Sequence, residues 1–506
     1  MLDGSGRLLA VRRRFRIRTY GCQMNVHDSE KVANLLLHAG WEEAPSEDAA
    51  ELLVINTCSV RAKAENKLYS DLGALRAWKK AEAGRLLAVG GCVAQQEGDP
   101  LLRRFPHLDF VFGTHNLRWV PAMADAAARG HREARTSQSD SPASALERFD
   151  LPERHPAYRS QTPGRAFLTV MEGCDMFCSF CIVPTTRGRE VSRPAPRVLE
   201  EARELADRGV CELTLLGQTV NAYGRHDLRR GRAEEAATLA FGELLARLAD
   251  IPGIERIRYT SPHPLFFDAA LVRAHGELPE LCPHVHLPLQ SGSDAVLRAM
   301  RRRYGADDYR RWADRLREAR PDLAITTDLI VGFPGETDAD FRLTLELVQE
   351  IGFVDSYSFK YSARPGTAAH QLDAKPVDGT TAQARLEELQ TLQRSLTLAA
   401  HRKRVGGQTE VLIEGPSRRD GALGPQLQGR DPYHRVVNLS GAHLPPRGPG
   451  AADEGRGIGE IVRVEIVEAT PHSLIGEPLG RGADRHSGLK HTGRMADEEG
   501  RREALP

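Results

Sequence analysis

The sequence contains no long hydrophobic run. None of its apolar segments approaches the ~20 consecutive residues that a membrane-spanning helix needs. The first residues, MLDGSGRLLAVRRRF, also lack the apolar core of a secretory signal peptide. From these two absences we expect a cytoplasmic protein without a membrane segment.

The sequence also lacks a net charge, because 69 Lys and Arg residues balance 69 Asp and Glu residues. Bulk charge therefore gives no indication of a nucleic-acid partner, and an RNA site would have to be a local basic patch. An apolar content of 41% and a charged content of 27% are typical of a globular protein. With 506 residues the chain is too long for one hydrophobic core, and we expect about three domains.

Cysteines are few, eight in all, and without a secretion signal they favour metal binding or catalysis over disulfides. Cys174, Cys178 and Cys181 form a C-x3-C-x2-C array in GCDMFCSFC, after the apolar run AFLTV. A fourth local ligand is missing, since His155 and His226 lie outside this loop. Structural zinc sites and electron-transfer clusters normally use four protein ligands. Three ligands would leave one corner of an iron–sulfur cluster open for a substrate, and a zinc site with a distant fourth ligand is the alternative.

Residues 14–132 alternate strand-like and helix-like segments, which predicts a doubly wound α/β domain. Cys22, Cys58 and Cys92 each directly follow a predicted strand, in FRIRTYGC, ELLVINTC and LLAVGGC. Ligands collect at the carboxyl ends of strands in such sheets, so the three thiols can converge although they are distant in sequence. Alternatively, they are buried small hydrophobic residues, as free cysteines often are.

Residues 133–160 are rich in Ser, Pro and charge, which predicts a linker. Residues 161–398 contain six strand candidates that alternate with helical stretches: AFLTVM, ELTLLG, RIRYTS, HVHLPL, AITTDLIVG and SYSFKYS. This alternation predicts a partial (β/α)6 barrel, whose active site would lie at the carboxyl ends of the strands. The loop that contains Cys174 lies at that end.

Residues 401–476 contain the short β runs TEVLI, HRVVNL, GEIVRVEIV and SLIG, which predict a small all-β, OB-like barrel. Its basic clusters could contact RNA phosphates, with Arg430 and Arg435 in GRDPYHRVV as candidates. Solvated surface charge is the ordinary interpretation of such clusters. Residues 477–506 are polar and nearly free of large apolar side chains, which predicts a disordered tail.

The motifs HLPLQSGSD and TTDLIVGFPGET lie at predicted strand ends of the barrel. The side chains of Gln290 and Ser291, and the backbone amides of Gly332 and Gly335, could meet a polar ligand there. Glycine-proline segments after strands are usually only turns, so these motifs are weak by themselves. The two remaining cysteines, Cys211 and Cys282, fit no ligand array and are assigned to core packing.

Seven segments together resemble the methylthiotransferase family of the radical S-adenosylmethionine (SAM) superfamily. They are YGCQMN, NTCSVRAKAENK, GCVAQQEG, MEGCDMFCSFCIVPTTRG, LLGQTVNAYG, HLPLQSGSD and TTDLIVGFPGET. The resemblance runs in order through residues 15–476 and implies an N-terminal cluster domain, a radical SAM core and a terminal TRAM barrel. GCQMN and NTCSVRAKA are similar to the MiaB branch, which acts on isopentenyladenosine in tRNA. Thr185 departs from the family pattern, in which Tyr is usual, and this bears on substrate contacts rather than on the clusters.

The resemblance implies two [4Fe–4S] clusters and SAM as cofactor. It also implies a chemistry in which each cluster uses its one iron without a protein ligand. Carbon 2 of adenine has no acidic proton, so one cluster would cleave SAM to a 5′-deoxyadenosyl radical that removes the hydrogen there. The second cluster would carry the sulfur, and a second SAM would supply the methyl group. The implied ligands are Cys174, Cys178 and Cys181 for the first cluster, Cys22, Cys58 and Cys92 for the second, and Gln218, Gln290, Ser291, Gly332 and Gly335 for SAM.

No catalytic side chain is assigned beyond these ligands. The implied partners are tRNA with an isopentenylated adenosine and a low-potential electron donor such as flavodoxin or ferredoxin, and we expect a monomer. Three other functions stay open: methylthiolation of a ribosomal protein, methylthiolation of a different modified adenosine, and a non-catalytic RNA-binding module with zinc knuckles. GCQMN argues against the first two.

Overall fold

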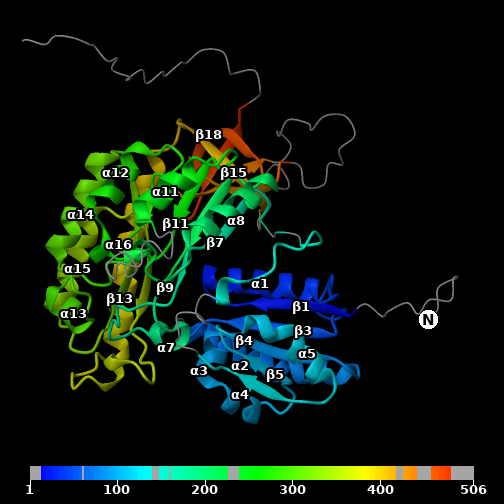
Figure 1. The fold of residues 1–506 in the computed structure, drawn as a ribbon. Coiled ribbons are helices and arrows are strands. Elements are labelled where there is room, and N and C mark those ends of the chain that lie inside the picture. The colour runs from blue at the N-terminus through cyan, green and yellow to red at the C-terminus, as the bar shows by residue number, and fades with distance from the viewer. Residues whose placement is uncertain are drawn as a thin grey trace, which may run out of the picture.

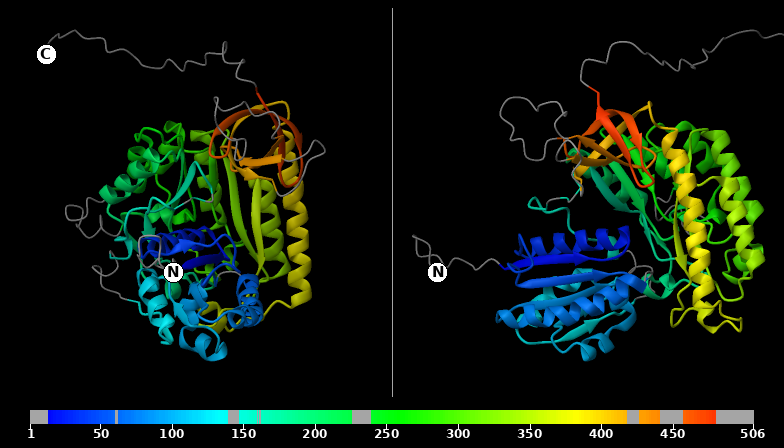
Figure 2. Two further views of the ribbon diagram at one scale, coloured as in Figure 1. Left: turned by 90° about the vertical axis from the view of Figure 1, so that its right-hand side faces the viewer. Right: turned by 180° about the vertical axis from the view of Figure 1, so that it is seen from behind.

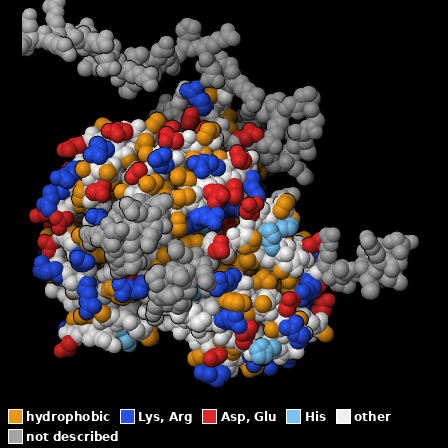
Figure 3. All heavy atoms as spheres, in the orientation of Figure 1, with side chains coloured by type: hydrophobic (Ala, Val, Ile, Leu, Met, Phe, Trp, Pro, Cys, Tyr) orange, Lys and Arg blue, Asp and Glu red, His pale blue; other side chains and the backbone are white. Residues whose placement is uncertain are grey.

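The computed structural model describes residues 13–59, 62–138, 147–158, 160, 162–225, 239–417, 426–440 and 457–479. They form an α/β unit at one end, a partial barrel in the middle and a small β-barrel at the other end (Figures 1 and 2). Within these ranges no helix is both long enough and apolar enough to cross a membrane. On the face drawn in Figure 3, basic and acidic side chains are interspersed, as the balanced composition leads one to expect.

The N-terminal sheet has six parallel strands in the order β2-β1-β3-β4-β5-β6. The strand order reverses between β1 and β3, and the helices that follow these two strands pack on opposite faces of the sheet. Ligands bind in the crevice at such a switch point of a doubly wound sheet. The strands are β1 (Arg14–Thr19), β2 (Glu42–Glu43), β3 (Leu52–Thr57), β4 (Leu86–Gly91), β5 (Phe110–Phe112) and β6 (Glu133–Arg135).

Alternate residues of these strands supply two separate cores. Leu52 and Val54 pack with α1 and α5 on one face, whereas Leu53 and Ile55 pack with α2, α3 and α4 on the other. Because both faces are covered, the central strands β3, β4 and β5 are mainly apolar runs in the sequence. The helices are α1 (Gln23–His38), α2 (Ala62–Ala81), α3 (Cys92–Glu97), α4 (Asp99–Arg104) and α5 (Val120–Ala128).

The middle unit has six parallel strands in two hydrogen-bonded groups, β7-β10-β11 and β12-β13-β14. One continuous core contains side chains from both groups and from the helices outside them, so the unit is the partial (β/α)6 barrel that the alternation predicted. The strands are β7 (Arg165–Thr169), β10 (Glu212–Leu216), β11 (Arg256–Tyr259), β12 (His284–His286), β13 (Ala324–Val331) and β14 (Asp355–Lys360). The helices used below are α7 (Val183–Arg187), α8 (Ala195–Asp207), α11 (Phe241–Ala249), α12 (Ala269–Glu277), α13 (Asp294–Ala299), α14 (Ala306–Ala319), α15 (Asp338–Ile351) and α16 (Gly379–Arg402).

The C-terminal unit is a closed barrel of five strands in the order β15-β16-β17-β19-β18. A small core of Val, Ile and Leu side chains fills it. The sequence analysis expected four of these strands and missed β16, because QLQGR has no apolar alternation. The strands are β15 (Gln408–Pro416), β16 (Gln426–Arg430), β17 (Val436–Ser440), β18 (Ile461–Ala469) and β19 (Leu474–Pro478).

Two arginines of β11 join the small barrel to the partial barrel. Arg258 donates to the backbone carbonyls of Asp431, at 2.7 Å, and Pro432, at 2.8 Å. Arg256 donates to the carbonyl of Glu410 at 3.1 Å. The small barrel therefore covers one end of the partial barrel, while the N-terminal unit lies toward the other end, beside α7 (Figure 1).

Two predicted borders differ in detail from the structure. Strand β6 pairs with β5, so the N-terminal sheet extends three residues, Glu133–Arg135, into the segment predicted as a linker. Strand β19 ends at Pro478, inside the segment predicted as a tail. Residues 480–506 lie outside the described residues, and their predicted disorder stays a prediction.

Candidate functional site

The structure brings Cys22, Cys58 and Cys92 together at the carboxyl edge of the N-terminal sheet. Cys22 precedes α1, Cys58 follows β3, and Cys92 begins α3 directly after β4. All three are free thiols, and Cys58 forms hydrogen bonds with both of the others. The convergence that strand-end spacing predicted is thus present, at the switch point of the sheet.

Close backbone packing supports this arrangement. Gly21 has φ of +128°, and a Cβ there would stand 2.4 Å from the Cβ of Cys58. The Asn56 side chain donates to the Asn25 carbonyl at 2.8 Å and to the Ser29 hydroxyl at 2.9 Å, which ties the end of β3 to the start of α1. Only glycine fits at position 21 without displacing a thiol.

The second set, Cys174, Cys178 and Cys181, lies in the loop between β7 and α7, together with the short strand β8 (Met171–Glu172). The backbone amide of Ser179 donates to the Met300 carbonyl at 3.0 Å, and its hydroxyl donates to the Ala299 carbonyl at 2.8 Å. The Cys181 amide donates to the Cys178 carbonyl at 3.0 Å. These bonds fix the loop at the end of α13.

Two side chains contact the thiols of this set directly. The Thr219 hydroxyl lies 3.0 Å from the Cys174 sulfur. The guanidinium of Arg302, which is buried, donates to the Cys178 sulfur at 3.2 Å. Such N–H···S bonds tune a sulfur ligand that a metal cluster would use.

The thiols differ in acidity, and in the N-terminal set hydrogen bonds with Cys22 and Cys92, together with burial, raise the pKa of Cys58 well above its usual value. Hydrogen bonds with Cys58 lower the pKa of Cys22 to about 6 and that of Cys92 to about 7, against the effect of burial, and the charge of Arg187 lowers both further. Burial instead raises the pKa of Cys174 to about 11 and that of Cys181 to about 12. Metal-bound thiols are deprotonated, so binding at the thiols with a raised pKa, Cys58, Cys174 and Cys181, would release protons.

Within the described ranges, no three Cys, His, Asp or Glu side chains have the geometry that would hold one metal ion. A [4Fe–4S] cluster binds each thiolate through a different iron atom, so its ligands need not converge on a single point. The three free thiols of each set therefore fit a cluster better than a zinc ion. A zinc site would need a fourth ligand as well.

The five residues predicted to contact SAM differ in whether their polar groups already have hydrogen-bond partners within the chain. The Gly332 amide donates to the Glu336 carboxylate at 2.6 Å, and the Gly335 amide donates to the Lys375 carbonyl at 3.0 Å. Neither amide is therefore a free donor, because each already has a partner within the chain.

Among the three polar side chains, Gln218 is best placed. Its Oε1 accepts a hydrogen bond from the Gly173 amide beside the cysteine loop, and its buried Nε2 has no hydrogen-bond partner in the part of the chain that the structure describes. Gln290 is buried with φ of +76°, an uncommon backbone conformation for a residue other than glycine. Ser291 is fully buried and accepts from the Ser293 amide at 3.2 Å, so its hydroxyl supports the loop before α13.

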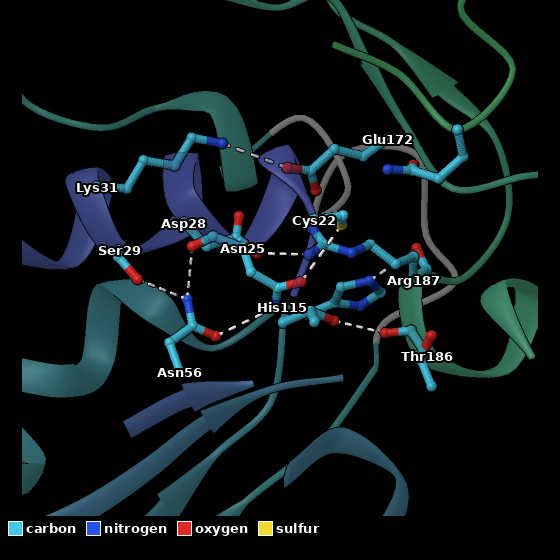
Figure 4. Close-up of polar contacts among 12 residues, drawn as sticks. Cys22, Asn25, Asp28, Ser29, Lys31, Asn56, His115, Glu172, Thr186 and Arg187 are labelled. Carbon is cyan, nitrogen blue, oxygen red and sulfur yellow. Dashed lines mark hydrogen bonds and ion pairs between the residues drawn. The ribbon is translucent and has the colours of Figure 1, made fainter. Parts of the chain in front are cut away.

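The interface between the N-terminal unit and the partial barrel is polar and passes through α7 (Figure 4). Arg187 forms a buried ion pair with Asp28 at 2.5 Å. Lys31 pairs with Glu172 at 3.4 Å, beside the cysteine loop of the barrel. The Thr114 hydroxyl donates to the Thr186 carbonyl at 2.5 Å. Helix α1, which begins directly after Cys22, is thus connected both to α7 and to the cysteine loop of the barrel.

Sequence patterns did not identify two arginines that lie at these sites, Arg187 and Arg302. Arg187 lies in the quoted segment VPTTRG, but no spacing rule links it to Asp28, which is distant in the chain. Arg302 is one of three consecutive arginines, and only the structure shows which of them is buried against a thiol. Thr185, the departure from the family pattern, is exposed.

The structure does not favour the expected phosphate contacts of the small barrel. The Arg435 side chain is 9% exposed and pairs with the fully buried Asp431 at 3.4 Å. Arg430 pairs with Glu414 at 3.4 Å. Both side chains thus already have an acidic partner within the protein, and their contact with RNA phosphates stays a prediction.

Three family models match the chain. They are the uncharacterized protein family UPF0004 over residues 14–113, the radical SAM superfamily over residues 168–348, and the TRAM domain over residues 402–479. A solved structure with a similar fold is TsrM, a radical SAM methyltransferase from Kitasatospora setae, with a TM-score of 0.52 and 14% identity over 71% of this chain and 74% of that one. The partial barrel with its three-cysteine loop is therefore a radical SAM domain.

Curated relatives define the family more narrowly. The tRNA-2-methylthio-N(6)-dimethylallyladenosine synthase of Geobacter metallireducens is 46% identical over 461 residues, which are 91% of this chain and 97% of that protein. The synthase of the same name from Paracoccus denitrificans is 44% identical over 468 residues, 92% of this chain and 97% of the relative. The chain belongs to this family, and it is a radical SAM enzyme that methylthiolates tRNA.

Proposed function

We propose that the protein methylthiolates carbon 2 of N6-isopentenyladenosine next to the anticodon of tRNA, giving 2-methylthio-N6-isopentenyladenosine. The observation that carries this proposal is the pair of three-thiol sets, one on each side of the interface at α7. The names of the relatives support the nucleoside.

We assign one [4Fe–4S] cluster to Cys174, Cys178 and Cys181 and a second to Cys22, Cys58 and Cys92. When bound, the clusters and two SAM molecules supply a 5′-deoxyadenosyl radical, the sulfur atom and the methyl group. Three thiolates leave one iron of each cluster free, which suits SAM at one cluster and sulfur at the other.

The residues of the chain hold these groups in place. Ser179 fixes the cysteine loop to the end of α13, and Gln218 holds the Gly173 amide while its Nε2 stays available for a polar ligand. The mouth of the barrel, between the two units, is where the adenosine would enter. A low-potential donor such as flavodoxin or ferredoxin supplies electrons, and the enzyme works as a monomer.

Nucleoside mass spectrometry of tRNA from a deletion strain tests this proposal. We expect N6-isopentenyladenosine to accumulate and its 2-methylthio derivative to disappear, and the intact gene to restore it. The C211A variant, which changes a cysteine outside both sets, should restore it as well, whereas the C174A variant should not. Unchanged tRNA nucleosides together with an altered ribosomal protein mass would contradict the proposal.

A further inference from the structure

Arg187 lies beside the N-terminal thiols although it belongs to the radical SAM domain. It is the last residue of α7, a few residues after Cys181 in the chain. Figure 4 shows its side chain extending from α7 toward Cys22 and Asp28 of the other unit. Asp28 belongs to α1, the helix that begins directly after Cys22, so the ion pair brings the guanidinium to the helix that starts at the N-terminal thiols.

The guanidinium of Arg187 is buried, with a side-chain exposure of 4%, and is only partly satisfied. Its Nη2 donates to the Asp28 carboxylate at 2.5 Å. Its Nη1 has no hydrogen-bond partner among the described residues, and neither has Oδ1 of Asp28. A buried donor without an acceptor costs about 1–3 kcal/mol, so a group that accepts from Nη1 would remove a real penalty.

The other charges nearby are already paired with one another. Glu172 lies 3.4 Å from Lys31 and 3.8 Å from Arg148. Arg187 and Asp28 are also paired with each other, but among the described residues each keeps one buried polar atom without a hydrogen-bond partner, Nη1 and Oδ1, which can interact with whatever the three thiols hold. The thiol set in the loop of the partial barrel has a similar feature, because the buried Arg302 donates to the Cys178 sulfur at 3.2 Å.

We propose that Arg187 is a positioning residue for the cluster on Cys22, Cys58 and Cys92. Its Nη1 donates to a sulfur atom at that cluster, and its charge makes the cluster easier to reduce. This proposal rests on the proposed function, which assigns a cluster to these thiols. Hydrogen bonds to sulfur and a neighbouring cation both stabilise the more negative, reduced state, so they raise the reduction potential.

Consequently the N-terminal site is complete only when α7 is docked against it. The cluster domain supplies the thiols, and the radical SAM domain supplies the cation. The state of one site is thereby linked to the position of the loop that forms the other.

The test is a redox titration followed by electron paramagnetic resonance, with iron content measured in parallel. The parent protein is the full chain with C174A, C178A and C181A, so that only the N-terminal cluster is left to titrate. In this parent we compare R187M, R187K and D28N, with R197M as a control, because Arg197 is exposed and pairs only with Glu200 nearby.

We expect R187M to lower the ratio of reduced to oxidised cluster at a fixed potential at least tenfold, which corresponds to about 59 mV for one electron. D28N should raise that ratio, because it removes a negative charge and keeps the arginine. R187K should shift less than R187M, and R197M should not shift.

A merely structural role predicts a different pattern. R187M and D28N break the same ion pair, so both would lose iron alike and the remaining cluster would keep its potential. Unchanged reduction potentials in D28N and R187K would overturn the proposal. So would a shift of the potential in the same direction in R187M and D28N. If R187M loses its iron, the potentials of D28N and R187K still decide the question. Absence of iron from the parent would overturn the proposed cluster site and this proposal with it.

Discussion

At Gly21 the backbone limits what can stand beside the N-terminal thiols. A Cβ at this position would lie 2.4 Å from the Cβ of Cys58 and 2.8 Å from the Asn25 side chain, and φ is +128°. Gly40 also has a positive φ, +82°, but nothing lies within 4 Å of the position of its Cβ. Alanine substitutions at Gly21 and Gly40 therefore separate the free-energy cost of backbone strain from the cost of displacing a thiol.

We predict that G21A lowers the iron of reconstituted protein from about eight to about four atoms per chain, because Cys58 is displaced and one four-iron cluster is lost. G40A should keep the iron and lose only about 1–2 kcal/mol of local stability from the left-handed backbone. Iron analysis after anaerobic reconstitution measures both. Full iron in a folded G21A would show that the N-terminal set tolerates this displacement.

Residue positions were predictable where a local rule applied. The six cysteines followed from two spacings, one within a loop and one across strand ends, and the structure brings each set together. Arg187, Asp28 and Arg302 were not predictable, because their contacts join segments far apart in the chain. Charge alone did not settle the role of a residue either, since Arg435 is basic but already pairs with Asp431.

Among the elements, strands with apolar patterns were predicted well and strands without them were not. The strands β3 and β4 are buried throughout and begin with apolar runs, LLVI and LLAV, since the sheet is covered on both faces. Strand β16 has the sequence QLQGR, and what defines it is its pairing with β15 and β17 rather than burial. Backbone pairing of this kind leaves little trace in the sequence.

Strand β11 has a second role, as the element on which the small barrel docks. Arg258 donates to two backbone carbonyls of the segment after β16, and it also pairs with the buried carboxylate of Glu212 at 3.1 Å. Removing it would leave Glu212 with Arg256, at 3.8 Å, as its nearest cation.

We predict that R258M weakens this junction by about 3 kcal/mol, since it breaks a buried charge pair. Hydrogen exchange of the β16 and β17 amides should then be roughly a hundredfold faster. R311M is the matched control, because Arg311 is exposed and pairs with the neighbouring Asp308, and its effect should stay below about 0.5 kcal/mol. Equal exchange in both variants would contradict a docking role for β11.

At the scale of the whole molecule, two sheets with different architectures meet at an interface that passes through α7. The switch point of the N-terminal sheet presents Cys22, Cys58 and Cys92, and the loop after β7 presents the second set. The interface between them contains buried ion pairs beside a small apolar cluster of Met24, Phe167 and Leu216. The small barrel covers the other end of the radical SAM domain and contributes no residue to either thiol set.

The central claim is that the two thiol sets perform different steps of one reaction. Its most direct test is the C22A, C58A and C92A triple variant, assayed anaerobically for 5′-deoxyadenosine and for methylthiolated nucleoside with isopentenylated tRNA. The account predicts that 5′-deoxyadenosine is still formed while no methylthio product appears, because SAM cleavage needs only Cys174, Cys178 and Cys181. Loss of all SAM cleavage in a folded variant that keeps about four irons would contradict this division, and so would formation of the methylthio product.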